Sequence, residues 1–292
     1  MTLPVNLYCD LHVHSCMSDG ADTPKEAAAA AAKAGLRTVA LTDHNTISGL
    51  TEFSAAAKEL GLNGICGCEF STEYAGKELH ILGLYLPEEI WPDVRAYTDE
   101  RNKRKARSNR ECTERLAAAG YDISYDAILE KNPGASINRM HIARELMEKG
   151  YAPGVKEALY SLLQPEQGYF LEPARMDAIE TLRRIRAWGG VSVWAHPLTS
   201  ADYNEAEAFL PALVDTGLDG IEVLYSLYSE EDTRFALSLA EKFALLPSGG
   251  SDYHGINKPD ISIGTGRGNL QVPNEFASAL ARRAESHRLE RR

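Results

Sequence analysis

The sequence predicts an α/β fold of βα units arranged around a parallel sheet or barrel. Short apolar runs alternate along the chain with longer segments of helical pattern. Histidines and carboxylates recur at the ends of these runs, and one long stretch without strand signals interrupts the alternation. The 292 residues, 44% of them hydrophobic, suffice for one large domain or for a domain that carries an insertion.

The first expected strand, Leu7 to His14, alternates so that Asp10, His12 and His14 fall on one side. A capping box with proline at the first helical position then begins an alanine-rich helix, which ends at Gly35. Later apolar runs predict the strands 38–41, 65–68, 79–86 with a hairpin across Gly76, 191–196, 220–224 and 245–252. Helices are expected over 48–60 and 176–188.

The stretch without strand signals has a charge balance of its own. It carries 12 basic and 11 acidic residues over 99–170, whereas the whole chain has a net charge of −11. We therefore expect a helical insertion over 99–170 that caps the site of an acidic barrel. The barrel itself would then consist of residues 1–98 and 171–292.

Composition limits the class of partner and the compartment. The negative charge argues against binding of long DNA. The amino-terminal residues lack the pattern of a signal peptide, and no run of about 18 uncharged apolar residues predicts a membrane span. Five cysteines without paired spacing argue against a disulfide framework, and Cys66 and Cys68 read as buried thiols rather than as ligands. We expect a cytoplasmic protein.

Six of the eight histidines lie within or just after strand-like runs, and carboxylates accompany them. Strand ends converge at one rim of a barrel, and this donor set suits zinc, manganese or iron. Nine ligands are too many for one ion and suffice for two or three, which can bind a phosphoryl oxygen and activate water. The candidates are His12, His14, Asp19, His44, Glu69, His80, His196, Asp252 and His254.

Each candidate also has a simpler interpretation. A single histidine on an apolar run is commonly a hydrogen-bonded core residue, and Asp19 in Ser18-Asp19-Gly20 could be a turn residue. Glu69 could be an ordinary acid at a strand end. Six histidines at the same kind of strand position favour the metal interpretation over these alternatives.

The motifs that contain these residues resemble the PHP family (polymerase and histidinol phosphatase). In order, they are Asp10-Leu11-His12-Val13-His14-Ser15, Ser18-Asp19-Gly20, Thr42-Asp43-His44-Asn45, Gly67-Cys68-Glu69-Phe70, Leu79-His80-Ile81-Leu82-Gly83, Ala195-His196-Pro197 and Gly250-Ser251-Asp252-Tyr253-His254. Helical residues after the His80 strand resemble the TrpH-type branch, which contains nucleoside 3′,5′-bisphosphate phosphatases.

The resemblance implies a distorted (βα)7 TIM-like barrel with two or three divalent ions. Mn²⁺ is the expected metal, and Zn²⁺ or Fe²⁺ are the alternatives. It also implies that Glu69 bridges two ions. Asp10 and Asp43 are expected to orient ligands rather than bind metal. The residues expected to act in catalysis are His12, His14, Glu69, His196, Asp252 and His254.

The insertion offers a candidate site for a second phosphate. Residues 101–110 contain six basic side chains and no acid, and Arg104 and Arg107 share one helix face. Ser136, Asn138, Arg139 and His141 lie at an expected helix start, where free N–H groups attract anions. The alternatives are a solvated helix face for the basic run and helix capping for Ser136 and Asn138.

The predicted reaction is hydrolysis of the 3′-phosphate of nucleoside 3′,5′-bisphosphates by metal-bound hydroxide. The resemblance adds trimming of short single-stranded RNA from the 5′ end. Histidinol-phosphate phosphatase is the alternative enzyme, and a non-catalytic regulatory PHP module is the alternative of another class.

Overall fold

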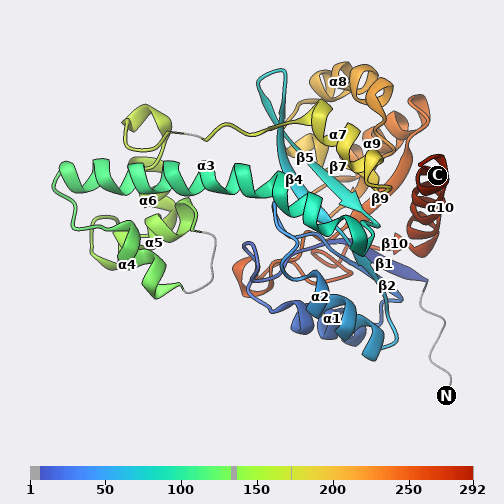
Figure 1. Ribbon diagram of the computed structural model, residues 1–292, viewed down its shortest axis with the longest axis horizontal. Helices are drawn as coiled ribbons and strands as arrows, with labels where there is room; N and C mark the ends of the chain where they lie inside the picture. Colours follow the sequence, from blue (N-terminus) through green and yellow to red (C-terminus); the bar gives the residue numbers. More distant parts are fainter. Residues whose placement is uncertain (1–6, 133–136, 172, 292) are drawn as a thin grey trace. The chain divides into compact units, whose positions relative to one another are not determined.

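The computed structural model describes residues 7–132, 137–171 and 173–291, and it has mixed α/β structure (Figure 1). The strands are β1 (Tyr8–Val13), β2 (Thr38–Leu41), β3 (Asn63–Cys66), β4 (Cys68–Tyr74), β5 (Lys77–Leu84), β6 (Met176–Asp177), β7 (Val191–Ala195), β8 (Gly220–Tyr225), β9 (Leu246–Gly250) and β10 (Val272–Pro273). The α-helices are α1 (Pro24–Lys33), α2 (Leu50–Glu59), α3 (Trp91–Ala118), α4 (Tyr125–Lys131), α5 (Arg139–Glu148), α6 (Val155–Ser161), α7 (Ala178–Ala187), α8 (Tyr203–Thr216), α9 (Glu230–Lys242) and α10 (Asn274–Glu290).

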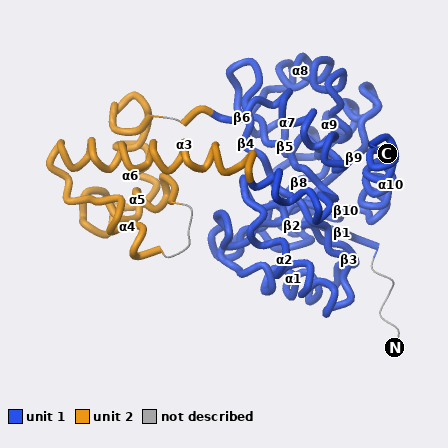
Figure 2. The backbone as a smooth tube through the Cα atoms, in the orientation of Figure 1, with its two compact units in different colours: residues 1–95, 175–292 blue, residues 96–174 orange. Residues whose placement is uncertain are grey.

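The chain forms two compact units (Figure 2). Unit 1 comprises residues 1–95 and 175–292, and unit 2 comprises 96–174. Unit 2 has its own helical core, in which Leu116 of α3 and Ile142 of α5 are fully buried. The insertion expected over 99–170 lies within unit 2, and its role as a cap remains a prediction.

The strands of unit 1 form two sheets. One has the order β10-β1-β2-β3, with β1, β2 and β3 parallel. The other has the order β6-β4-β5-β7-β8-β9. The predicted α/β class is confirmed, but the described residues form no single closed sheet.

Hydrogen bonds join the two sheets at two places. The backbone N–H of His14 donates to the Tyr253 carbonyl at 2.9 Å, which links the end of β1 to the end of β9. The Asn45 N–H, which follows β2, donates to the carbonyl of Glu69 on β4 at 2.8 Å. The carboxyl ends of strands from both sheets therefore meet in one region.

The strand expected over residues 65–68 is in fact the junction of β3 and β4. Gly67 lies between them, and a Cβ there would stand 2.9 Å from the Gly83 carbonyl oxygen. Ala75 and Gly76 then turn β4 back onto β5, which confirms the predicted hairpin. So short a turn can join only antiparallel strands, which is why this part departs from a parallel pattern.

The helices of unit 1 cover apolar side chains of the sheets. The start of α1 has the predicted capping box, in which Thr23 and Glu26 exchange hydrogen bonds. α1 and α2 lie side by side (Figure 1), and Phe53 of α2 is fully buried. None of the helices in the described part of the chain is both long and apolar enough to cross a bilayer, and the cytoplasmic location stays a prediction.

Candidate metal centre

All nine predicted ligands come together in unit 1. Their donor atoms form three overlapping groups in which every atom lies within 4.8 Å of the others in its group: His14, Asp19, His44 and His254; His12, His14 and Glu69; and His44, Glu69 and His80. His196 joins the cluster through Glu69, with 3.1 Å between its Nε2 and Oε1. Asp252 joins it through His14, with 3.3 Å between Oδ1 and Nε2.

Glu69 is the hub of this cluster. It is fully buried on β4, and a ring nitrogen of each of five histidines lies 2.8–3.1 Å from one of its oxygens: His12, His14, His44, His80 and His196. A carboxylate has about four lone-pair directions, so it cannot accept a hydrogen bond from all five rings. Both ring nitrogens of His14, and Nδ1 of His44 and of His80, are buried without a hydrogen-bond partner among the described residues.

Hydrogen bonds on the outer side of the cluster select the tautomers of two of these histidines. Nδ1 of His12 lies 3.0 Å from Oε1 of Glu222, a carboxylate that accepts a hydrogen bond from the Nδ1–H group. Nδ1 of His196 lies 2.9 Å from the Thr199 hydroxyl, which itself donates to the His196 carbonyl and so accepts from the ring. In both neutral rings the Nε2 lone pair therefore faces Glu69.

His254 follows the same arrangement on the Asp19 side. Its Nδ1 lies 2.8 Å from the Asp252 carbonyl, an acceptor, and its Nε2 lies 3.2 Å from Oδ1 of Asp19. A lone pair facing a carboxylate at this distance is repulsive unless a metal ion, or a proton on Nε2 in the metal-free protein, lies between them. Atoms about 3 Å apart can both lie about 2.0–2.2 Å from one ion, as in protein sites with nitrogen and oxygen ligands. The residues fit divalent transition metals.

The ionisable side chains of the cluster shift one another's pKa values. Burial alone would raise the pKa of Glu69, but neighbouring histidines, His12 and His80 among them, outweigh it and hold that pKa well below the usual range. Burial lowers the pKa of His44 to about 3, with the neighbouring His14 adding to the effect. A neutral His44 and an ionised Glu69 are the protonation states that bind metal.

The backbone is unusual at three of the strand ends. His196, Asp252 and Asn45 follow β7, β9 and β2, and all three adopt positive φ angles, of 30°, 56° and 51°. Asn and Asp tolerate this conformation, whereas histidine adopts it at an energetic cost. Gly250 adds a close approach of strands, because a Cβ there would overlap the Cβ of His12.

Asp10 and Asp43 act on the backbone of the site. Asp10 accepts hydrogen bonds from the N–H groups of His12, Ser251 and Gly264. Asp43 accepts from the N–H and hydroxyl of Ser15, at 2.8 and 2.6 Å. Neither carboxylate belongs to a metal-binding group among the described residues, and their predicted orienting role remains the interpretation.

Glu222 is a site residue that the sequence-based predictions did not include. It is fully buried on β8, and besides His12 it accepts the His196 backbone N–H through Oε2 at 2.6 Å. The available signal was a single carboxylate in the apolar strand Gly220–Tyr225. An unpaired acid in a buried strand is costly, so its presence indicates a partner.

The predicted phosphate-binding residues lie in unit 2. Arg104 pairs with Glu100 on α3, and Arg107 is exposed. Asn138 caps α5 and contacts His141 Nδ1 at 2.7 Å, so the capping alternative describes its geometry. The Arg139 guanidinium lies 4.6 Å from the centre of the Phe170 ring. Ser136 lies outside the described residues.

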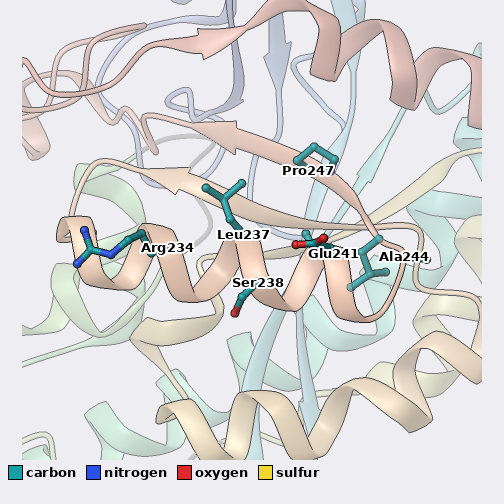
Figure 3. Close-up of a pocket in the computed structure, with 8 residues that line it drawn as sticks. Arg234, Leu237, Ser238, Glu241, Ala244 and Pro247 are labelled. Atoms are coloured by element: carbon teal, nitrogen blue, oxygen red, sulfur yellow. The ribbon is translucent and has the colours of Figure 1, made fainter.

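A separate groove of about 660 Å³ lies along α9 and the start of β9. Figure 3 shows its lining, which includes Arg234, Leu237, Ser238, Glu241, Ala244 and Pro247. None of the nine candidate ligands contributes to it. Its lining offers no imidazole, so its chemistry differs from that of the metal centre.

Known proteins resemble this chain along most of its length. A phosphoribosyl 1,2-cyclic phosphate 1,2-diphosphodiesterase from Eggerthella lenta is 33% identical over 250 residues, covering 84% of this chain and 94% of that protein. A 5′-3′ exoribonuclease from Haemophilus influenzae is 31% identical, covering 84% and 89%. A 3′,5′-nucleoside bisphosphate phosphatase from Chromobacterium violaceum is 31% identical, covering 87% and 90%.

Solved structures and the family model agree with these relatives. A protein assigned as a metal-dependent phosphoesterase, from Bifidobacterium adolescentis, superposes with a TM-score of 0.80 at 27% identity, covering 94% of this chain and 96% of its own. The PHP domain model matches residues 10–164. The family and the TrpH-type resemblance expected from the motifs are confirmed, and the chain belongs to the PHP family of metal-dependent phosphoesterases.

Proposed function

We propose that the protein removes the 3′-phosphate of nucleoside 3′,5′-bisphosphates and trims short RNA from the 5′ end. The reaction would use two or three divalent ions, with Mn²⁺ as the favoured metal. The main support for metal-dependent chemistry is that five histidine nitrogens surround the buried Glu69 carboxylate. Their lone pairs and the carboxylate oxygens occupy one small region, which a cluster of cations would make stable.

The nine candidate ligands, Glu69 among them, would hold these ions. When bound, the ions would supply positive charge for the phosphoryl group and a nucleophile from water at neutral pH. Within the protein, Glu222 and Thr199 keep the Nδ1 protons of His12 and His196 on the outer side. This arrangement leaves both Nε2 atoms free for the metals before the substrate arrives.

The nucleotide substrate is supported by relatives and by residues of unit 2. Relatives about 31% identical are named as a nucleoside bisphosphate phosphatase and as an exoribonuclease. Arg139 stacks on Phe170 through the face of its guanidinium, which leaves N–H groups at its edge for a phosphate. We propose that Arg139 binds the second phosphate, together with Arg104, Arg107 and the start of α5.

The test compares substrates with one phosphate and with two. We expect the Mn²⁺-loaded protein to cleave a nucleoside 3′,5′-bisphosphate much faster than the 3′-monophosphate, since binding of the remote phosphate helps to position the reacting one. Arg139→Ala should remove most of this preference, about 1.5–3 kcal/mol for a charged hydrogen bond, and should spare an aryl phosphate.

Arg110→Ala is the matched control. Arg110 also lies in unit 2 and also stacks on an aromatic ring, that of Tyr125, at 4.6 Å. The control variant should keep the preference for the bisphosphate. Equal rates of the parent on the two nucleotides would contradict the proposed substrate and favour a small monoester.

The Eggerthella relative gives a second candidate substrate. It is 33% identical and is named for a cyclic phosphodiester of phosphoribose. A five-membered cyclic phosphodiester belongs in the same assay. Faster cleavage of that compound than of any bisphosphate would replace the nucleotide by a sugar cyclic phosphate as the substrate class.

A further inference from the structure

Lys258 lies beside the metal centre and was not among the predicted site residues. It follows the short turn Gly255–Asn257, and its Nζ lies 2.7 Å from Oδ2 of Asp252. Its side chain is 41% exposed, whereas that of Asp252 is 8% exposed. The ammonium group therefore bridges a buried candidate ligand and the solvent.

The two oxygens of Asp252 have different partners. Oδ1 faces the histidines, at 3.3 Å from His14 Nε2 and 3.4 Å from His254 Nδ1. Oδ2 accepts hydrogen bonds from the Tyr225 hydroxyl at 2.8 Å and from Lys258. Oδ1 is thus the oxygen available to a metal, and Lys258 contacts the oxygen on the other side.

Hydrogen bonds hold the segment that carries Lys258 in place. The Asn257 side-chain amide donates to the Asp19 carbonyl at 2.8 Å, and the Tyr253 hydroxyl donates to Asp22 at 2.7 Å. The Ala21 N–H donates to the His254 carbonyl at 3.0 Å. Because both ends of the segment are attached to the loop that contains Asp19, the position of the ammonium group is restricted.

We propose that Lys258 is a substrate-binding residue that donates a hydrogen bond to an oxygen of the phosphoryl group. The inference rests on the proposed phosphoesterase function. An ammonium group has three N–H donors, and the contact with Asp252 orients the group while part of it stays in solvent. A positive charge already held beside the reacting group stabilises the charge on the phosphoryl oxygens without reorganisation.

The alternative role for Lys258 is to hold Oδ2 of Asp252 in position by a hydrogen bond and so to act only on the metals. Tyr225 distinguishes the two roles, since its hydroxyl donates to the same oxygen but carries no positive charge. If Lys258 acts only through Asp252, Tyr225→Phe and Lys258→Met should have similar effects. If Lys258 binds the phosphoryl group, only its replacement should weaken binding of a phosphate.

The experiment measures the affinity of the Mn²⁺-loaded protein for inorganic phosphate by calorimetry, with bound manganese counted in each variant. We expect Lys258→Met to weaken phosphate binding about tenfold or more, the usual loss for a charged hydrogen bond. Lys258→Arg and Tyr225→Phe should stay within about threefold of the parent. The control is Lys242→Met, which removes an exposed lysine of α9 that pairs with Glu207.

Three results would overturn the assignment of Lys258: unchanged phosphate affinity in Lys258→Met, equal losses in Lys258→Met and Tyr225→Phe, or loss of manganese from Lys258→Met. The last two would mean that the lysine acts through Asp252. If phosphate binding depends on Lys258 but the parent hydrolyses no phosphoester, the proposed function fails and the assignment stands. If the parent hydrolyses phosphoesters and neither phosphate affinity nor KM changes in Lys258→Met, the proposed function stands and the assignment of Lys258 fails.

Discussion

At the scale of single residues, the metal centre depends on which nitrogen of each histidine carries the proton. Glu222 is decisive because each of its oxygens accepts one N–H: that of the His12 ring at 3.0 Å and that of the His196 backbone at 2.6 Å. A group with two acceptors is required in this position. Such outer partners orient metal-binding histidines and raise their basicity.

Glu222→Gln keeps the size of the side chain and replaces one acceptor by a donor. The backbone N–H of His196 is a fixed donor, so the new NH₂ group would face the His12 ring and reverse its tautomer, with the proton on Nε2. We expect manganese affinity to fall about 10–100-fold. Titration of metal-free protein with Mn²⁺ measures this loss, and an affinity within twofold of the parent would contradict the role of Glu222.

Asp10→Asn provides a contrast at the same scale. Asp10 accepts three backbone N–H groups at 2.7–3.3 Å and contacts no imidazole in these hydrogen bonds. Its amide variant would leave a buried donor facing an N–H group, which costs about 1–3 kcal/mol of unfolding free energy. We expect a loss of stability in the metal-free protein, measured by urea unfolding. An unchanged midpoint would show that the backbone contacts are dispensable.

At the scale of elements, the carboxyl-terminal helix α10 is attached to unit 1 by polar contacts. His287 Nε2 lies 3.2 Å from Oδ1 of Asp219, and its Nδ1 lies 2.8 Å from the Gly190 carbonyl. Arg283 pairs with Asp219 at 3.0 Å, and Asp219 also accepts from the Ser192 N–H. Both ring nitrogens face acceptors, so the doubly protonated imidazolium is the form that fits.

This arrangement predicts a pH-dependent contribution of α10 to stability. The hydrogen bond to Asp219 raises the pKa of His287 against the effect of burial. A raised pKa in the folded state stabilises the protein below the unfolded pKa, about 6.5, and the contribution is lost as pH rises through the folded pKa. Relative to His287→Gln, the parent should be more stable by about 1–2 kcal/mol at low pH.

Urea unfolding of both proteins at several pH values tests this prediction. The difference between them should shrink as the pH rises, because His287 loses its positive charge and with it the favourable interaction with Asp219. Arg283→Gln is the control, since it removes a contact with Asp219 that does not titrate near neutral pH. A difference that stays constant across the range would mean that folding does not change the pKa of His287.

At the scale of the whole molecule, we expect folding of unit 1 and metal binding to be coupled. The ligands come from β1, β4 and β5 and from the residues after β1, β2, β7 and β9, so ions bound there would connect both sheets. The cluster of ligands brings carboxylates together in a chain whose net charge is already −11. Divalent ions would offset part of this charge where it is most crowded.

Removal of the metals should therefore lower both activity and stability. Purified protein should contain two or three equivalents of transition metal, and chelation should abolish phosphoester hydrolysis. A site with free Mn²⁺ at 100 times its Kd adds about 2.7 kcal/mol to the folded state, which corresponds to a Tm increase of several degrees. Thermal unfolding with and without EDTA measures this change, and full activity with an unchanged Tm in EDTA would contradict the metal centre.

The sequence by itself determined the α/β class and the family, and it predicted a helical insertion over 99–170. Local patterns specify these features: the capping box at Thr23, the alternation around His12, and the ordered motifs that contain the nine candidate ligands. Such signals extend over only a few residues, and they are readable because amphipathic periods and caps act locally. Even the hairpin at Gly76 followed from a local turn signal.

Tertiary structure decided what depends on residues far apart in the chain. Glu222 contacts His12 across 210 positions, and Glu69 gathers nitrogens from segments as distant as His196. The arrangement of the strands in two joined sheets also depends on pairing between distant segments. A tautomer, a shared carboxylate and an ammonium group beside Asp252 result from packing between strands, which no periodicity of the sequence records.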